Sequence, residues 1–169
     1  MDAAGLADGA LYAAQSPLAL GAILAACLAC RPASRRAAAA MAALLGVSLL
    51  SGYATPDTWP AATIAACVLG VLGVFVAANG QFRAASPLAL VPGGFAAALA
   101  AGVPTATPAE AAGSVALLLV PGAALLLARA SIRWPARLQL GASIARRMAG
   151  AWITAVGILL LALRARGVL

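Results

Sequence analysis

The stretch ALYAAQSPLALGAILAACLACRPASRR, residues 10–36, decides how this chain is organised. Residues 10–30 carry no charge, and Arg31, Arg35 and Arg36 follow directly. An apolar run of about 20 residues is long enough, as a helix, to cross a hydrocarbon core of about 30 Å. Arginines placed directly after such a run are typical of the cytoplasmic end of a membrane helix. The stretch therefore predicts a transmembrane helix that ends on the cytoplasmic side.

The composition of the whole chain agrees with a membrane protein. Of its 169 residues, 64% are hydrophobic and 9% are charged, whereas a soluble domain is about half apolar and a quarter charged. The net charge of +7 comes from arginines in short segments between apolar runs, so we expect it to report membrane topology and not nucleic-acid binding. The three cysteines all lie in apolar runs, which argues against a disulfide framework.

Five more apolar runs follow the first. We predict an all-α fold, a polytopic transmembrane bundle in which residues 1–169 form a single domain. Nine of the eleven arginines fall on one side of the alternating runs and all four acidic residues on the other, which places both termini in the periplasm of a bacterial inner membrane. Only Arg164 and Arg166 disagree. The predicted helices cover residues 10–30, 37–54, 61–78, 86–103, 111–128 and 148–163.

Proline–glycine pairs interrupt two of the predicted helices. A proline removes a backbone hydrogen bond, and in lipid the freed carbonyl must be satisfied by protein or by water in a cavity. Two explanations stay open: a kink that improves packing, which we favour, or a broken helix that lines a binding cavity. A capping box, Thr107-Pro108-Ala109-Glu110, is predicted to start the fifth helix. The predicted breaks lie at Pro92, Gly93, Gly94, Pro121 and Gly122.

Small residues on the helix flanks suggest where another helix could dock. In lipid, glycine and alanine allow close helix contact, and this contact drives association. Gly70 with Gly73, and Gly150 with Gly157, are the candidate docking positions for a partner protein. Arg133, Trp134 and Arg137 are a candidate anchor on the cytoplasmic side.

Apolar patterns recur along the chain at residues 55–70 (TPDTWPAATIAACVLG), 86–90 (SPLAL) with Phe95, 147–151 (RMAGA) and 155–160 (AVGILL). With the order of segments, these patterns resemble the HupE/UreJ family, small membrane proteins regarded as nickel permeases linked to hydrogenase and urease maturation. The likeness covers nearly the whole chain and implies the same helical fold.

The metal ligands of that family are missing from this chain. The family's first helix carries a His-Pro-x-x-Gly-x-Asp-His motif, where this chain has Ser16, Ala22 and Ile23 at the positions of His, Asp and His. Nickel prefers imidazole and oxygen donors, and the chain has no histidine. Cys27, Cys30 and Cys67 lie at depths too different for one shared site, so packing explains them better. We predict no metal site, no cofactor and no enzymatic activity.

Two functional hypotheses remain. The first is a non-catalytic accessory subunit that packs against a larger membrane complex, with the lipid bilayer and other membrane subunits as its partners and no role in nucleic-acid binding. The second is a permease-like transporter of a metal ion or another small solute. Functional sites in membranes normally display polar residues at depth. Because this sequence shows almost none, the accessory hypothesis is favoured.

Overall fold

The computed structural model describes residues 3–30, 32–54, 60–78, 86–101, 107–131 and 136–166. Within these ranges every regular element is a helix, which confirms the predicted all-α class. The elements are α1 (Ala3–Gln15), α2 (Pro17–Ala29), α3 (Arg35–Tyr53), α4 (Ala61–Ala77), the 3-10 helix η1 (Ser86–Ala89), α5 (Leu90–Ala101), α6 (Pro108–Ser131) and α7 (Ala136–Ala165).

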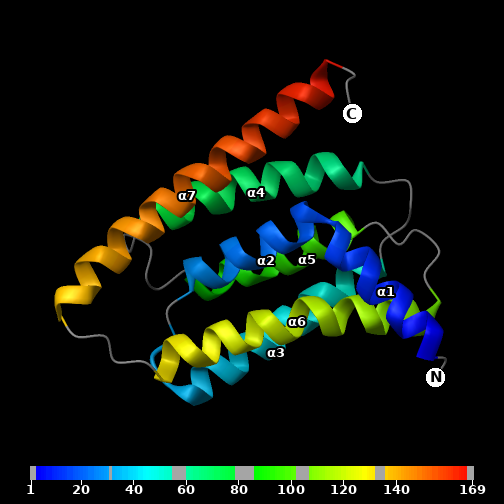
Figure 1. The fold of residues 1–169 in the computed structure, drawn as a ribbon, viewed down its shortest axis with the longest axis horizontal. Helices are drawn as coiled ribbons and strands as arrows, with labels where there is room; N and C mark the ends of the chain where they lie inside the picture. The colour runs from blue at the N-terminus through cyan, green and yellow to red at the C-terminus, as the bar shows by residue number, and fades with distance from the viewer. Residues whose placement is uncertain are drawn as a thin grey trace.

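The helices from α2 to α7 run in alternating directions along one axis (Figure 1). Helices α2 and α5 occupy the middle, where they contact each other. Helices α3 and α6 pack on one side of this pair, and α4 lies on the other. Helix α7 lies outside α4 and reaches the rest of the protein almost entirely through it, while α1 crosses one end of α6 (Figure 1).

The first predicted helix is in fact two helices. The prediction of one continuous helix over residues 10–30 is wrong, because α1 and α2 meet at an angle of 77°. The corner has a local cause: Pro17 disfavours helical geometry in the residue before it, and Ser16 is extended there. Pro17 then opens α2 at a position where its missing N–H costs nothing. The Ser16 hydroxyl accepts a hydrogen bond from the Ala19 N–H at 3.2 Å and so caps α2.

The last helix is longer than its apolar run. We expected a helix over residues 148–163 after a polar, arginine-dotted stretch, but α7 already begins at Ala136. Arginine, leucine, glutamine and alanine are good helix formers, and no proline occurs between positions 136 and 165. Polarity alone does not end a helix, so the stretch before the apolar run is largely helical as well.

In the part of the chain that the structure describes, three helical segments are long and apolar enough to cross a membrane: Arg35–Tyr53, Pro108–Ser131 and Gly141–Ala165. A fourth span is added if the bent pair α1 and α2 is counted as one. Helix α4 and the segment Pro87–Ala101 are apolar but shorter. The described residues are thus helical and include three to four segments able to span a membrane, which supports the prediction of a membrane protein.

The interior between the central helices is built from small side chains. Ala22, Ala25 and Ala26 of α2 are fully buried, as are Ala96 and Ala97 of α5. Small residues let two helix backbones approach closely, which maximises van der Waals contact where no water is available to drive burial. Larger fully buried side chains come from α3, α5 and α6: Leu45, Leu49, Leu90, Leu118 and Leu126.

Candidate functional site

The first predicted helix break, at Pro92, is a helix start. Pro92 lies in the first turn of α5, directly after η1, where backbone N–H groups have no partner within the helix. The two glycines that follow are packed. A Cβ added at Gly93 would overlap Ala26 of α2, and one at Gly94 would lie 2.8 Å from the Ser48 Cβ of α3. Neighbouring helices fill the space at both glycines, which favours the packing explanation over a binding cavity.

The second predicted break does not interrupt its helix. Helix α6 runs through Pro121 from Pro108 to Ser131. Leu118 and Leu126, on either side of the proline, are fully buried, so packing holds the helix together despite the missing hydrogen bond. A Cβ added at Gly122 would lie 2.8 Å from a methyl group of Leu45 and 3.4 Å from the Cys27 sulfur. Gly122 thus serves close packing, and α6 continues through Pro121, which favours the packing explanation over a broken helix that lines a cavity.

The four candidate docking glycines meet one another inside the chain. A Cβ at Gly73 would overlap Thr154, one at Gly150 would overlap the backbone of Ala77, and one at Gly157 would lie 2.8 Å from the Gly70 nitrogen. The prediction of close helix contact at these positions is correct. Helices α4 and α7 of the same chain use Gly73, Gly150 and Gly157 on each other, whereas a Cβ at Gly70 would meet nothing within 4 Å. Docking of a partner protein at these positions stays a prediction.

The candidate anchor lies mostly outside the described residues. This holds for Arg133 and Trp134, and for the side chain of Arg137, whose backbone belongs to α7. Among the described residues, Arg129 of α6 is an arginine that joins two helices. Arg129 donates hydrogen bonds from Nη1 to the carbonyls of Cys27 at 2.9 Å and Leu28 at 3.0 Å. It thereby satisfies carbonyls at the C-terminus of α2, where a positive charge also complements the helix dipole.

The residues at the positions of the family's metal ligands have structural roles. Ser16 donates a hydrogen bond from its hydroxyl to the Ala100 carbonyl at 2.7 Å, which ties the α1–α2 corner to the end of α5. Ala22 and Ile23 are buried in the core.

The cysteines do not form a cluster. Cys27 and Cys30 are fully buried, whereas Cys67 is exposed on α4. In the part of the chain that the structure describes, no group of three or more His, Cys, Asp or Glu residues could hold a metal ion.

Three hydroxyl groups of the bundle are bonded to backbone carbonyls, whereas the buried hydroxyl of Tyr53 has no hydrogen-bond partner among the described residues. Ser48 donates to Leu44 within α3 at 2.8 Å, and Thr154 donates to Gly150 within α7 at 2.9 Å. Ser114 of α6 is fully buried and donates to Gly9 of α1 at 2.6 Å. A Ser or Thr that bonds its own helix is satisfied locally. These hydroxyls therefore stabilise helices or join them.

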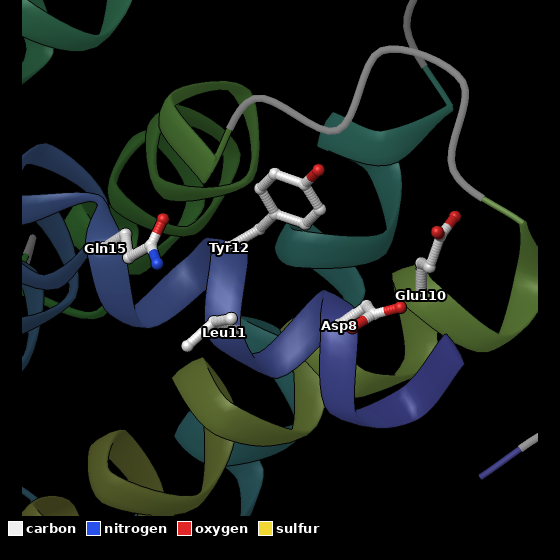
Figure 2. A pocket seen from close by; sticks show the side chains of 5 residues that line it. All are labelled: Asp8, Leu11, Tyr12, Gln15 and Glu110. Carbon is white, nitrogen blue, oxygen red and sulfur yellow. The ribbon is translucent and has the colours of Figure 1, made fainter. Parts of the chain in front are cut away.

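An open hollow of about 310 Å³ lies between α1 and the start of α6. It is lined by Asp8, Leu11, Tyr12 and Gln15 of α1 and by Glu110 of α6. Figure 2 shows Asp8 facing the first turn of α6, where Glu110 lies. Glu110 is held by the predicted capping box, which is confirmed: its carboxylate accepts from the Thr107 N–H at 2.7 Å, and its own N–H donates to the Thr107 hydroxyl at 3.3 Å.

Charged side chains thus gather at opposite ends of the bundle. Asp8 and Glu110 line the hollow at one end, which we call the acidic end. At the other end, the arginine end, Arg35 donates to Ser131 at 3.3 Å and Arg129 caps α2. Glu110 and Arg129 both belong to α6, and 19 residues at about 1.5 Å each separate them by about 28 Å. This is close to the thickness of a hydrocarbon core.

Comparison of the chain with protein-family models, with curated proteins and with solved structures finds no match.

Proposed function

We propose that this protein is a multi-pass inner-membrane protein with a HupE/UreJ-like fold, and that it serves as a non-catalytic accessory subunit of a larger membrane complex. The observation that carries the proposal is the use of polar groups inside the bundle. The hydroxyls of Ser48, Ser114 and Thr154 all bond backbone carbonyls, and the glycines near Pro92 and Pro121 are packed against neighbouring helices. A transport site would instead turn polar groups towards its solute.

The separation of charge supports the proposed orientation. The arginine end matches the cytoplasmic side by the positive-inside rule, and the acidic end matches the periplasmic side. The distance of about 28 Å along α6 between these ends fits one membrane crossing. With α2 to α7 alternating in direction, both termini then belong to the periplasmic side.

The surface that we propose for a partner is the outward face of α7. Only 11% of the apolar segment of α7 is buried inside the protein, whereas 28% of the corresponding segments of α3 and α6 is buried. Large apolar side chains on this helix are exposed, and Trp152 is the most exposed of them at 72%. Since lipid is as apolar as these side chains, binding there requires shape complementarity with another helix. The exposed apolar side chains of α7 are Ile144, Met148, Trp152, Val156, Ile158 and Leu159.

The test is purification of the native protein in mild detergent, followed by identification of the chains that accompany it. We expect Trp152→Ala with Met148→Ala to lose a partner that the wild type retains. Val47→Ala is the matched control, because Val47 is 65% exposed on α3, on the other side of the bundle. If the wild type runs alone in mild detergent and also in native lipid discs, the accessory proposal fails.

A permease-like function is the second candidate, and it is favoured by the acidic hollow beside the α1–α2 corner. Asp8 and Glu110 would attract cations at the periplasmic mouth of such a protein. Proteoliposomes loaded with a cation-sensitive dye test this function. Cation uptake that Asp8→Asn reduces several-fold would support a permease, whereas uptake equal to that of empty liposomes would exclude it for the cations tried.

A further inference from the structure

Helix α1 has a place in the fold that its sequence did not predict. We infer that α1 is an interfacial helix, which lies in the headgroup region of the periplasmic leaflet with lipid as its partner. The inference rests on the membrane insertion proposed above, and it changes the role of the first apolar run from one membrane-crossing helix to a surface helix joined to a short buried one.

The lengths and the angle of the two helices exclude a straight span. Helix α2 has 13 residues, which at about 1.5 Å per residue make about 20 Å. Helix α1 also has 13 residues, but at 77° to α2 it adds only about a fifth of its length, or about 4 Å, along the α2 axis. Together they reach about 24 Å, short of a core of about 30 Å. Most of α1 therefore runs across the bundle axis.

Contacts with α6 and α5 fix α1 in this orientation. A Cβ at Gly9 would overlap the backbone of Glu110, and one at Gly113 would overlap the backbone of Leu6, so the two helices cross with almost no side chain between them. The Ser114 hydroxyl bonds the Gly9 carbonyl at this crossing. The bond from Ser16 to Ala100 holds the other end of α1. Helix α1 thus cannot swing into line with α2 without losing its close crossing with α6 and the bond between Ser114 and Gly9.

The free surface of α1 has a polar flank and an apolar flank. The polar flank carries Asp8, Tyr12 and Gln15, and Leu11, which lines the same hollow, projects from α1 in another direction than Tyr12 (Figure 2). The exposed Ala7 continues the apolar flank on the Leu11 side. Leu11 is 58% exposed and Tyr12 53% exposed. A helix in the membrane interface turns an apolar flank towards the acyl chains and a polar flank towards water, with tyrosine at the boundary.

The charge of α1 indicates which lipid surface it fits. Interfacial helices that select anionic lipids carry lysine or arginine on the polar flank. From Ala3 to Gln15 the charged residue is Asp8, and no basic residue occurs. We therefore assign a leaflet of zwitterionic headgroups to α1, with Leu11 and its alanine neighbours in contact with the upper acyl chains.

The experiment measures the membrane depth of nitroxide labels in phosphatidylcholine vesicles. Single cysteines are placed at Ala7, Asp8, Leu11 and Gln15, all exposed positions of α1, and at Val120 on α6 as a reference for the hydrocarbon core. Cys67→Ala removes the exposed native cysteine, while Cys27 and Cys30 stay because they are fully buried. Collision rates with oxygen, which partitions into lipid, and with a water-soluble nickel chelate are compared at each label.

We expect oxygen collisions to dominate at Ala7 and Leu11 and chelate collisions at Asp8 and Gln15, with every α1 label shallower than Val120. If the excess of oxygen collisions over chelate collisions rises steadily from Ala7 to Gln15, α1 is part of a crossing helix. This result would overturn the inference about α1 but not the proposed function. Chelate dominance at all four α1 positions would place α1 in water and overturn it as well. Chelate dominance at Val120 would instead refute membrane insertion, and with it the proposed function.

Discussion

At the scale of single residues, glycines decide how closely α4 and α7 approach. Gly70 and Gly73 belong to the same helix, but only at Gly73 would an added side chain extend into the contact with α7. A Cβ at Gly73 would overlap Thr154 of α7, whereas a Cβ at Gly70 would meet nothing within 4 Å. The two positions therefore form a matched pair within one turn of α4.

We predict that Gly73→Ala lowers the free energy of unfolding by about 1–3 kcal/mol, since an extra methyl group in a full contact forces the helices apart. Gly70→Ala should instead raise this free energy by about 0.5–1 kcal/mol, because alanine is the better helix former and has room there. Thermal unfolding in detergent, followed by circular dichroism, measures both variants. Equal effects of the two substitutions would contradict the packing found between α4 and α7.

The residues at the family's ligand positions lead to a second prediction. Ser16 is used for the α1–α2 corner, and Ala22 and Ile23 are used for the core, so no donor set for nickel is expected in this chain. Protein purified without an affinity tag should carry less than a tenth of an equivalent of nickel after incubation with the metal and desalting. One equivalent per chain, measured by atomic absorption, would refute this prediction.

At the scale of elements, α6 shows that packing can hold a helix together across a proline. Pro121 lacks the N–H that would bond the Leu117 carbonyl, and its ring crowds the preceding turn. The helix nevertheless continues, because Leu118 and Leu126 are buried against neighbouring helices and Gly122 allows Leu45 and Cys27 to approach.

We predict that Pro121→Ala stabilises the protein, since Pro121 is exposed and the substitution restores a hydrogen bond without entering the core. The gain should be at least about 1 kcal/mol, below the full cost of about 3 kcal/mol for proline in a helix interior, because the helix already tolerates it. Denaturation in detergent compares the variant with Leu118→Ala, which should lose about 2–5 kcal/mol by opening a cavity. A loss of stability in Pro121→Ala would indicate that the proline sets a bend that the packing requires.

At the scale of the whole molecule, charge and helix direction together set the proposed topology. Ala33 lies beside the arginine end, and Pro60 immediately precedes α4 at the other end; both residues are exposed. In a Cys67→Ala background, Pro60→Cys should react with an impermeant thiol reagent from the periplasm of intact cells. Ala33→Cys should react only after the inner membrane is permeabilised. Labelling of both positions from the same side would refute the topology.

Helical class and the ends of most apolar segments were predictable because they depend on local properties. The apolar runs and the arginines that border them predicted helices close to the observed α3, α4 and α6, and the capping box at Thr107 and Glu110 was predicted from a four-residue pattern. The corner at Ser16 was missed although its signal, a serine followed by proline inside an apolar run, is present in the sequence. Length and hydropathy outweighed it, since a run of 21 uncharged residues satisfies the rule for a membrane span.

What the sequence by itself determined is the composition of each surface: apolar helices, small residues at regular spacing, and charges that separate into two groups. Only the tertiary structure decided which surfaces meet. The glycines of α4 and α7 could accept any helix with a flat face, and nothing local says that they accept each other. Likewise, Ser114 and Gly9 are 105 positions apart, and their hydrogen bond is what sets α1 across α6. Pairing between distant segments depends on the fit of whole helix surfaces, and in lipid this fit is a matter of shape because every surface is equally apolar.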